Sequence, residues 1–247
     1  MVELNLTKEQ SLINLDLRKQ EVQNIVMGIP QLSNITSRVA LVLDFSGSMR
    51  NLYKNGTVQS VIERIMPIAM QFDDNQELDL WIFENGFTRI GGVTRENFYG
   101  LAEQIFNRYR MGGTQYAPVI EDIYKKYIKE EPAQLPNYVI FITDGENSDH
   151  GATTRIITEA SKAPIFWQFV GIGDEDFKYL KKLDDMGGRY VDNADFFSIP
   201  NINAMSDNEL YTKLFDEYPG WLSNDKVKQL IDSQGQSKGF FGGLFGR

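Results

Sequence analysis

Five oxygen-bearing side chains draw attention because of their types and their order along the chain. Two are carboxylates and three are hydroxyls: Asp44, Ser46, Ser48, Thr114 and Asp144. None of them offers sulfur or imidazole, and all-oxygen coordination selects a hard cation such as Mg²⁺, Mn²⁺ or Ca²⁺. Two carboxylates leave a bound dication about neutral, and hydroxyls are weak donors, so the ion keeps the capacity to accept a carboxylate from outside. The set therefore predicts a site for one divalent cation, provided that the fold brings three separate segments together.

Each of these residues also has a simpler explanation when it is taken alone. Ser46 or Ser48 could cap a following helix, and Asp144 could form a turn with Gly145. The case for a shared site rests on all three segments following predicted strands of one sheet.

Apolar runs of strand length alternate with amphipathic stretches of helical period. The predicted strands are 39–43, 78–83, 88–90, 139–142, 165–170 and 189–191. Most of these runs are apolar without a break, as in parallel strands that are covered on both faces. Asn85-Gly86 predicts a hairpin that makes the third strand antiparallel. The fold class predicted is α/β, a three-layer doubly wound (Rossmann-like), mostly parallel sheet of about six strands with one antiparallel edge strand.

In a doubly wound sheet, ligands bind beyond the carboxyl ends of the strands, where the strand order reverses. The first strand runs into Asp44 and the fourth into Asp144, while Gly112-Gly113 precedes Thr114 and lets the backbone approach closely. The three polar segments are therefore expected at the same edge of the sheet.

The chain divides into an N-terminal extension at 1–35, one domain at 36–232 and a Gly- and Phe-rich C-terminal tail at 233–247. In the extension, leucines alternate as in short strands, and 18–27 has helical character. The tail is open to two interpretations, a flexible terminus or an apolar docking motif.

Composition narrows the class of partner. The chain has 247 residues, with 25 Lys and Arg against 34 Asp and Glu, a net charge of −9 that disfavours nucleic acid and anionic membranes. There is no cysteine, so disulfides and thiolate-bound zinc are excluded. No apolar run approaches the roughly 20 residues of a membrane span, and no signal peptide is evident, which predicts a cytoplasmic protein.

The pattern Asp44-Phe45-Ser46-Gly47-Ser48, with Thr114 and Asp144 following, resembles the metal-ion-dependent adhesion site of von Willebrand factor A (vWA) domains. The family pattern is Asp-x-Ser-x-Ser, then a distant Thr and a distant Asp, and all five positions are filled. Segments 111–118, 164–171 and 183–185 are similar to the copine-like branch found in bacterial tellurium-resistance proteins.

The resemblance implies a protein-binding module and no enzymatic activity. Ser46, Ser48 and Thr114 would ligate Mg²⁺ (or Mn²⁺ or Ca²⁺), Asp44 and Asp144 would act directly or through water, and a partner protein's Asp or Glu would complete the shell. It further implies a bacterial adaptor in resistance to tellurite or other chemical stress.

The sequence leaves two enzymatic alternatives and one structural alternative. A Mg²⁺-dependent phosphatase of the haloacid-dehalogenase kind needs a second acid two residues after its nucleophilic Asp, and Ser46 stands there. A Ser-His-acid hydrolase would have to use His150, the only histidine, and no Gly-x-Ser-x-Gly elbow surrounds Ser46. The third alternative is a scaffold whose site is filled without engaging a partner. An open binding surface would be bordered by aromatic and Met side chains, and the candidates are Phe45, Met49, Tyr53 and Tyr116. The same four side chains could equally be buried.

Overall fold

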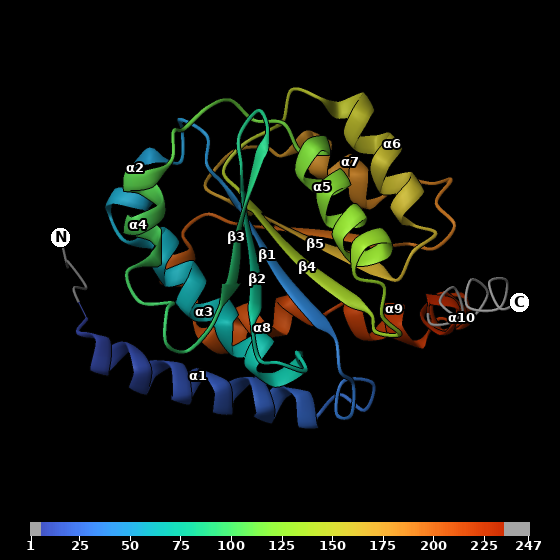
Figure 1. Ribbon diagram of the computed structural model, residues 1–247, viewed down its shortest axis with the longest axis horizontal. Helices are drawn as coiled ribbons and strands as arrows, with labels where there is room; N and C mark the ends of the chain where they lie inside the picture. The colour runs from blue at the N-terminus through green and yellow to red at the C-terminus, as the bar shows by residue number, and fades with distance from the viewer. Residues whose placement is uncertain (1–5, 235–247) are drawn as a thin grey trace, which may run out of the picture.

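The computed structural model describes residues 6–234 and contains a six-stranded sheet (Figure 1). The strands lie in the order β3-β2-β1-β4-β5-β6. Their bounds are β1 Arg38–Asp44, β2 Leu78–Phe83, β3 Phe87–Val93, β4 Asn137–Thr143, β5 Ile165–Ile172 and β6 Ala194–Ile199. All neighbouring pairs are parallel except β2 with β3, which are antiparallel across the Asn85-Gly86 turn. The predicted fold class is confirmed, including the antiparallel edge strand.

Helices cover both faces of the sheet (Figure 1). Their bounds are α1 Lys8–Met27, α2 Arg50–Lys54, α3 Thr57–Phe72, α4 Leu101–Arg108, α5 Ala117–Tyr124, the π-helix η1 Lys125–Glu130, α6 His150–Ala160, α7 Lys178–Asp184, the 3₁₀ turn η2 Ile202–Ala204, α8 Asp207–Leu214, α9 Tyr218–Ser223 and α10 Asp225–Gln234. Helices α1, α3 and α8 contribute to the core on one face, and α5, α6 and α7 to the core on the other. None of the helices within residues 6–234 is both long and apolar enough to cross a membrane.

The central strand β1 shows why its run of apolar residues is unbroken. Leu41 and Leu43 pack into one core, and Ala40 and Val42 pack into the other, all at 0% exposure. Burial of one large aliphatic side chain contributes about 1.5–3 kcal/mol. The strand is therefore fixed in place by both layers, and so is the position of Asp44 at its end.

The N-terminal segment is a helix, so the prediction of short strands there is wrong for the described residues. Thr7 caps α1 in a capping box with Gln10, and the buried Leu15 and Val22 face the core. The helix packs against α3 and α8, and Arg18 pairs with Asp207 of α8 at 3.0 Å. Leu15 is buried and Leu17 is 58% exposed, so these two leucines point to different sides of the helix, and the predicted helix at 18–27 is confirmed.

The last strand lies at Ala194–Ile199, and the prediction of a strand at 189–191 is wrong. Arg189 follows α7 and donates from Nε to the carbonyl of Met186 at 3.0 Å and from Nη2 to that of Asp184 at 2.6 Å. Carbonyls at a helix end have no partner within the helix, so this segment serves to cap α7 rather than to pair with β5.

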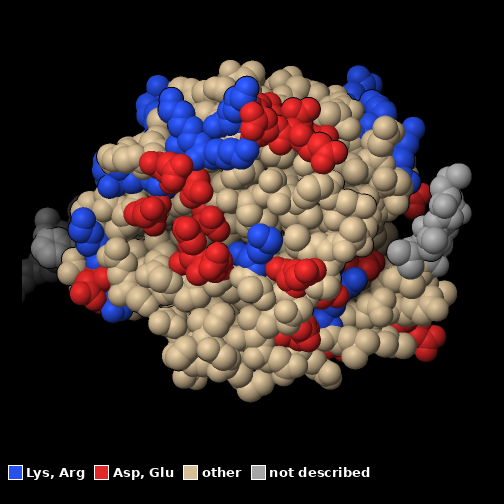
Figure 2. Space-filling view, turned by 180° about the vertical axis from the view of Figure 1, so that it is seen from behind, with Lys and Arg blue, Asp and Glu red and all other residues tan. Residues whose placement is uncertain are grey.

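The back of the molecule shows how the charge is distributed. Lys and Arg side chains gather along the upper part of that face, with Asp and Glu side chains in groups beside and below them, and neither kind covers the face (Figure 2). On this face there is no continuous basic surface of the kind that would follow a nucleic-acid backbone.

Candidate metal centre

The candidate centre begins where β1 and β4 end side by side. Leu43 pairs with Ile142, so Asp44 and Thr143 are neighbours at the carboxyl edge of the sheet. The order of connections reverses between these two strands, with β2 next to β1 on one side and β5 next to β4 on the other. Such a switch point is where a doubly wound sheet leaves room for a ligand.

Asp44 is fully buried, and both of its carboxylate oxygens are hydrogen-bonded. Oδ1 accepts a bond of 2.7 Å from the backbone N–H of Ser46, and Oδ2 accepts one of 2.7 Å from the hydroxyl of Thr143. Burial raises the pKa of Asp44 to about 6, and the charge of Asp144 adds to the effect. The carboxylate is thus held rigidly in a place where its own charge is poorly solvated.

A chain of hydroxyls joins the loop after β1 to the loop after β4. The hydroxyls of Ser46 and Ser48 lie 2.9 Å apart, and Ser48 donates to Oδ1 of Asp144 at 2.8 Å. Partial burial raises the pKa of Asp144, and the charge of Glu175 contributes. Four of the five predicted residues are therefore brought together in one small polar cluster.

The fifth residue, Thr114, lies in a third loop. The backbone of this loop contacts the loop after β1 and the loop after β4. Gly47 donates to the carbonyl of Gly112 at 3.0 Å, and Ser148 donates from its N–H at 2.9 Å and its hydroxyl at 3.1 Å to the carbonyl of Thr114. Within residues 6–234 the hydroxyl of Thr114 makes no hydrogen bond, so it is not part of the chain that Ser46, Ser48 and Asp144 form. The loop passes close to Glu84, since a Cβ on Gly112 would lie 2.6 Å from its carboxylate oxygen and 3.1 Å from its Cβ, so a larger residue here would require Glu84 to move.

Asp149 positions this loop, and the sequence analysis missed it. Its carboxylate accepts from the backbone N–H groups of Tyr116 at 3.0 Å and Ala117 at 2.9 Å, at the start of α5. Asn147 and Thr153 also donate to it. An Asp directly before a helix is a recognisable capping signal, but this one caps a helix 33 residues away along the chain, which no local pattern reveals.

The aromatic and Met side chains near the centre are buried. Phe45, Met49, Tyr53 and Tyr116 are at most 5% exposed. The hydroxyl of Tyr116 donates to the carbonyl of Gly145 at 2.6 Å. These side chains therefore support the loops from the core side. They do not border an open binding surface, and the groups around the opening are mainly polar.

A hollow of about 660 Å³ opens beside the centre, and both Ser48 and Asp144 line it. Its other walls carry two acids, Asp174 and Glu175, and several carboxamides, which include Asn51 and Asn201. The centre is thus accessible from outside through a surface rich in hydrogen-bonding groups.

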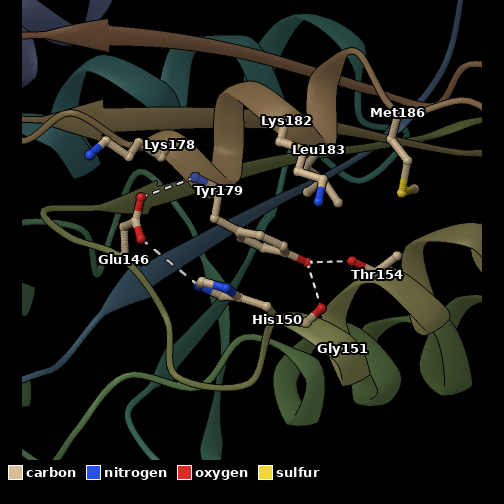
Figure 3. A pocket seen from close by; sticks show the side chains of 9 residues that line it. All are labelled: Glu146, His150, Gly151, Thr154, Lys178, Tyr179, Lys182, Leu183 and Met186. Carbon is tan, nitrogen blue, oxygen red and sulfur yellow. Dashed lines mark hydrogen bonds and ion pairs between the residues drawn. The ribbon is translucent and has the colours of Figure 1, made fainter.

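A second hollow of about 410 Å³ lies between α6 and α7 (Figure 3). The ring of His150 stacks on that of Tyr179, with the centroids 4.1 Å apart and the rings parallel, and Glu146 lies 4.0 Å from Nε2 of His150. Glu146 also accepts from the N–H of Tyr179 at 3.0 Å. Figure 3 shows no serine among the side chains that line this hollow, so His150 is not arranged there as the base of a Ser-His-acid set.

The donor set fits a hard divalent cation. The cluster supplies oxygen alone, and two of its members are carboxylates whose pKa values are raised because their charges are partly desolvated. A cation among these groups would offset that cost. Asp44, Ser46, Ser48, Thr114 and Asp144 are the residues that would hold it.

Comparison with known proteins points to one family. A family model described as vWA-TerF-like, the vWA domain found in the TerF C terminus, matches residues 36–231. The chain is 44% identical over 243 residues to YcbR of Bacillus subtilis (strain 168), and the alignment covers 94% of this chain and 99% of YcbR. It is 31% identical over 136 residues to Copine-E of Dictyostelium discoideum, which is 47% of this chain and only 23% of Copine-E.

The solved structures agree on the fold. The VWA domain of SpRpn10 superposes with a TM-score of 0.53 at 15% identity, covering 75% of this chain and 96% of that domain. At this identity the likeness concerns the arrangement of the sheet and helices alone.

Proposed function

Because the chain belongs to the vWA domain family, in the branch that includes the copines and the C-terminal domain of TerF, we propose that it is an adaptor that captures an acidic side chain of a partner protein through one divalent cation. The family is one of protein-interaction modules. The capture of a carboxylate by a metal is the specific part of the proposal.

The bond from Ser48 to Asp144 carries the proposal. It joins two loops that are far apart in the chain into one set of oxygens, at a place that opens to solvent. In this role Asp44 and Asp144 supply the negative charge, and Ser46, Ser48 and Thr114 supply neutral oxygens. A bound Mg²⁺ would provide a Lewis-acidic point to which a carboxylate from another protein can coordinate.

Binding is favoured over phosphoryl transfer by the state of Asp44. A nucleophilic Asp must present a free oxygen to its substrate, but this side chain is 0% exposed and both of its oxygens accept hydrogen bonds. The position two residues later is Ser46, which cannot protonate a leaving group as a carboxylic acid does. Incubation with a generic phosphate ester and Mg²⁺ is therefore expected to give no turnover that depends on Asp44.

The cellular setting belongs to the proposal as well. The match to the TerF-type domain supports a role in a bacterial response to tellurite or to other chemical stress, and the acidic, cysteine-free composition supports a place in the cytoplasm.

The test is affinity capture from a bacterial lysate in Mg²⁺ and in EDTA, followed by mutation of the captured partner. A partner of the proposed kind binds the wild type in Mg²⁺, loses binding in EDTA and to Asp44→Ala, and loses binding again when one of its own acidic residues becomes an amide. Asp225→Ala is the matched control, because this Asp side chain is 90% exposed on α10. A partner bound equally in EDTA, or bound equally by Asp44→Ala, would contradict the proposal.

A further inference from the structure

A group of basic side chains lies on α2 and around the end of α4, close to the candidate metal centre. The exposed members of this basic patch are Arg50, Lys54, Arg108 and Arg110. The stretches 45–62 and 104–120, which contain them, hold no Asp or Glu, although the whole chain has a net charge of −9. In Figure 2, blue side chains run along the upper right edge, which is the side of α2 and α4 in that view. The patch is therefore a local exception on an acidic protein.

The backbone places the basic patch next to the candidate metal centre. Arg50 comes two residues after Ser48, and Arg110 comes two residues before Gly112. Ser46 and Gly112 form a β-bridge, so the loop after β1 and the loop before α5 lie side by side. Two residues span at most about 7 Å, so the Cα atoms of both arginines lie within that distance of these two loops. A ligand at the centre is thus within reach of the patch.

An aromatic stack supports both the patch and the centre. The charged ends of Arg50 and Lys54 lie over the ring of Phe106, at 6.0 and 5.9 Å from its centroid. Phe106 stacks on the buried Tyr53 at 6.2 Å, and the hydroxyl of Tyr53 donates to the carbonyl of Asp44 at 3.3 Å. A cation at this distance is attracted to the face of a ring. The stack therefore holds two of the charges on the side of α2 that faces α4.

The four cations are not used by the fold as ion pairs. Over residues 6–234 none of them lies within 4.0 Å of a carboxylate oxygen. Lys54 and Arg108 are in the last turns of their helices, where a cation complements the helix dipole. Arg50 is in the first turn of α2, where a cation opposes the dipole, and Arg110 lies beyond the end of α4. Helix stability therefore does not account for the two arginines nearest the centre.

We propose that the basic patch binds further acidic side chains of the partner whose Asp or Glu the candidate metal centre captures, so that the partner presents an acidic segment with several carboxylates. The inference rests on the proposed function and adds the chemical character of the partner. Arg and Lys bind carboxylates through charge-assisted hydrogen bonds. The hollow beside the centre carries Asp174 and Glu175, which follow β5 and would repel such a segment. The extra carboxylates are thus directed toward α2 and α4.

An acidic protein segment fits this patch better than a nucleic acid or an anionic membrane. The patch is small, and the chain as a whole is acidic. A long or flat negative surface would meet the acids around the patch as well as the patch itself, and the net repulsion would oppose binding. A short segment can place its carboxylates on the four cations alone.

Fluorescence polarisation of the full chain with two labelled peptides tests the patch. One peptide has six glutamates in a row, and the other has one glutamate and five glutamines. In Mg²⁺ and low salt, the wild type is expected to bind the first at least about tenfold more tightly. Arg50→Gln/Arg110→Gln should lose this preference, while Arg50→Lys/Arg110→Lys keeps the charges and should retain most of it.

The matched control is Lys129→Gln/Lys213→Gln, which removes two exposed cations that also lie over rings, on η1 and α8. It changes the net charge by the same amount and should keep the preference for six glutamates. A loss of preference equal to that of Arg50→Gln/Arg110→Gln would mean that net charge alone is responsible, which would overturn the inference.

Two further results would also overturn it. One is a wild type that binds both peptides equally, or a preference that Arg50→Gln/Arg110→Gln retains. The other is binding of single-stranded DNA, or of vesicles of phosphatidylcholine and phosphatidylserine, that depends on the two arginines while peptide binding does not. Failure of the proposed function looks different, because the preference for six glutamates would then persist in EDTA and in Asp44→Ala.

Discussion

The hydroxyl of Ser48 donates a 2.8 Å hydrogen bond to the carboxylate of Asp144, a residue 96 positions later in the chain. The bond closes a polar cluster between the ends of β1 and β4, and Ser48 is exposed beside the hollow that leads to it. Removal of the Ser48 hydroxyl therefore tests the cluster from the surface, without making a cavity in the core.

Ser48→Ala is expected to weaken Mg²⁺ binding by at least about tenfold, the order of loss found when a supporting group of a metal site is removed. The melting temperature in EDTA should fall, because the buried hydroxyl of Ser46 loses its partner, at a cost of about 1–3 kcal/mol. Isothermal titration with Mg²⁺ measures the first quantity and a thermal scan the second. Ser223→Ala removes a hydroxyl that only donates to the carbonyl of Pro219, so it should bind Mg²⁺ like the wild type.

Asp149→Ala is expected to weaken Mg²⁺ binding although Asp149 is not a proposed ligand. The change removes the acceptor of the N–H groups of Tyr116 and Ala117, which frees the loop that carries Thr114. It should also destabilise the fold by about 1–3 kcal/mol, since several donors lose their partner. Asp149→Asn keeps one acceptor oxygen and should recover part of both losses. Equal Mg²⁺ affinity in Asp149→Ala and the wild type would contradict the positioning role.

Asp122→Ala is expected to destabilise the chain by about 1–3 kcal/mol in urea unfolding, because it leaves the buried Nε1 of Trp81 without its acceptor. Asp122 of α5 accepts from Nε1 of Trp81 at 2.9 Å and from two nitrogens of Arg89 at 2.6 and 2.8 Å. The ion pair between Arg89 and Asp122 joins the antiparallel edge strand β3 to the helical layer. Glu130→Gln alters two part-exposed ion pairs, with Arg89 and with Lys125, and should cost about 1 kcal/mol or less. Similar losses in the two variants would contradict this account.

The chain in EDTA is expected to be more stable at pH 5.5 than at pH 7.5. Burial raises the pKa of Asp73 to about 6 from its usual 3.8, so the folded state holds a proton that the unfolded state releases. The stabilisation is complete below the unfolded pKa and disappears as the pH rises through the folded pKa. The raised pKa values of Asp184 and Glu217 act in the same direction. Urea unfolding at the two pH values measures the difference.

Asp73→Asn should reduce that difference, because the amide does not titrate. Asp225→Asn changes a carboxylate that is 90% exposed on α10 and should leave the difference as it is in the wild type. A wild type that is equally stable at both pH values would contradict the expectation.

The sequence predicts the sheet well because the parallel strands are covered on both faces. A strand such as β4 is buried at every position, and it is apolar or aromatic from Tyr138 to Ile142, with polar residues only at its two ends. The edge strand β6 is harder to find, because Asp195 and Ser198 interrupt its apolar residues, while the nearby Arg189-Tyr190-Val191 looks more like a strand.

For the candidate site, spacing alone predicts that Asp44, Ser46, Ser48 and Asp144 meet, because the ends of parallel neighbours share one edge. Spacing does not predict Asp149, whose bonds go to a helix 33 residues away. Groups joined only by tertiary packing leave no periodic trace in a sequence.

Helix α1 lies outside the matched residues 36–231, yet Leu15, Val22 and Val26 are each at most 2% exposed against the rest of the chain. A recombinant fragment cut at the family boundary would leave the side of α3 and α8 that this helix covers open to water. Such a fragment would be prone to aggregate during purification, and adding α1 as a separate peptide should restore its solubility.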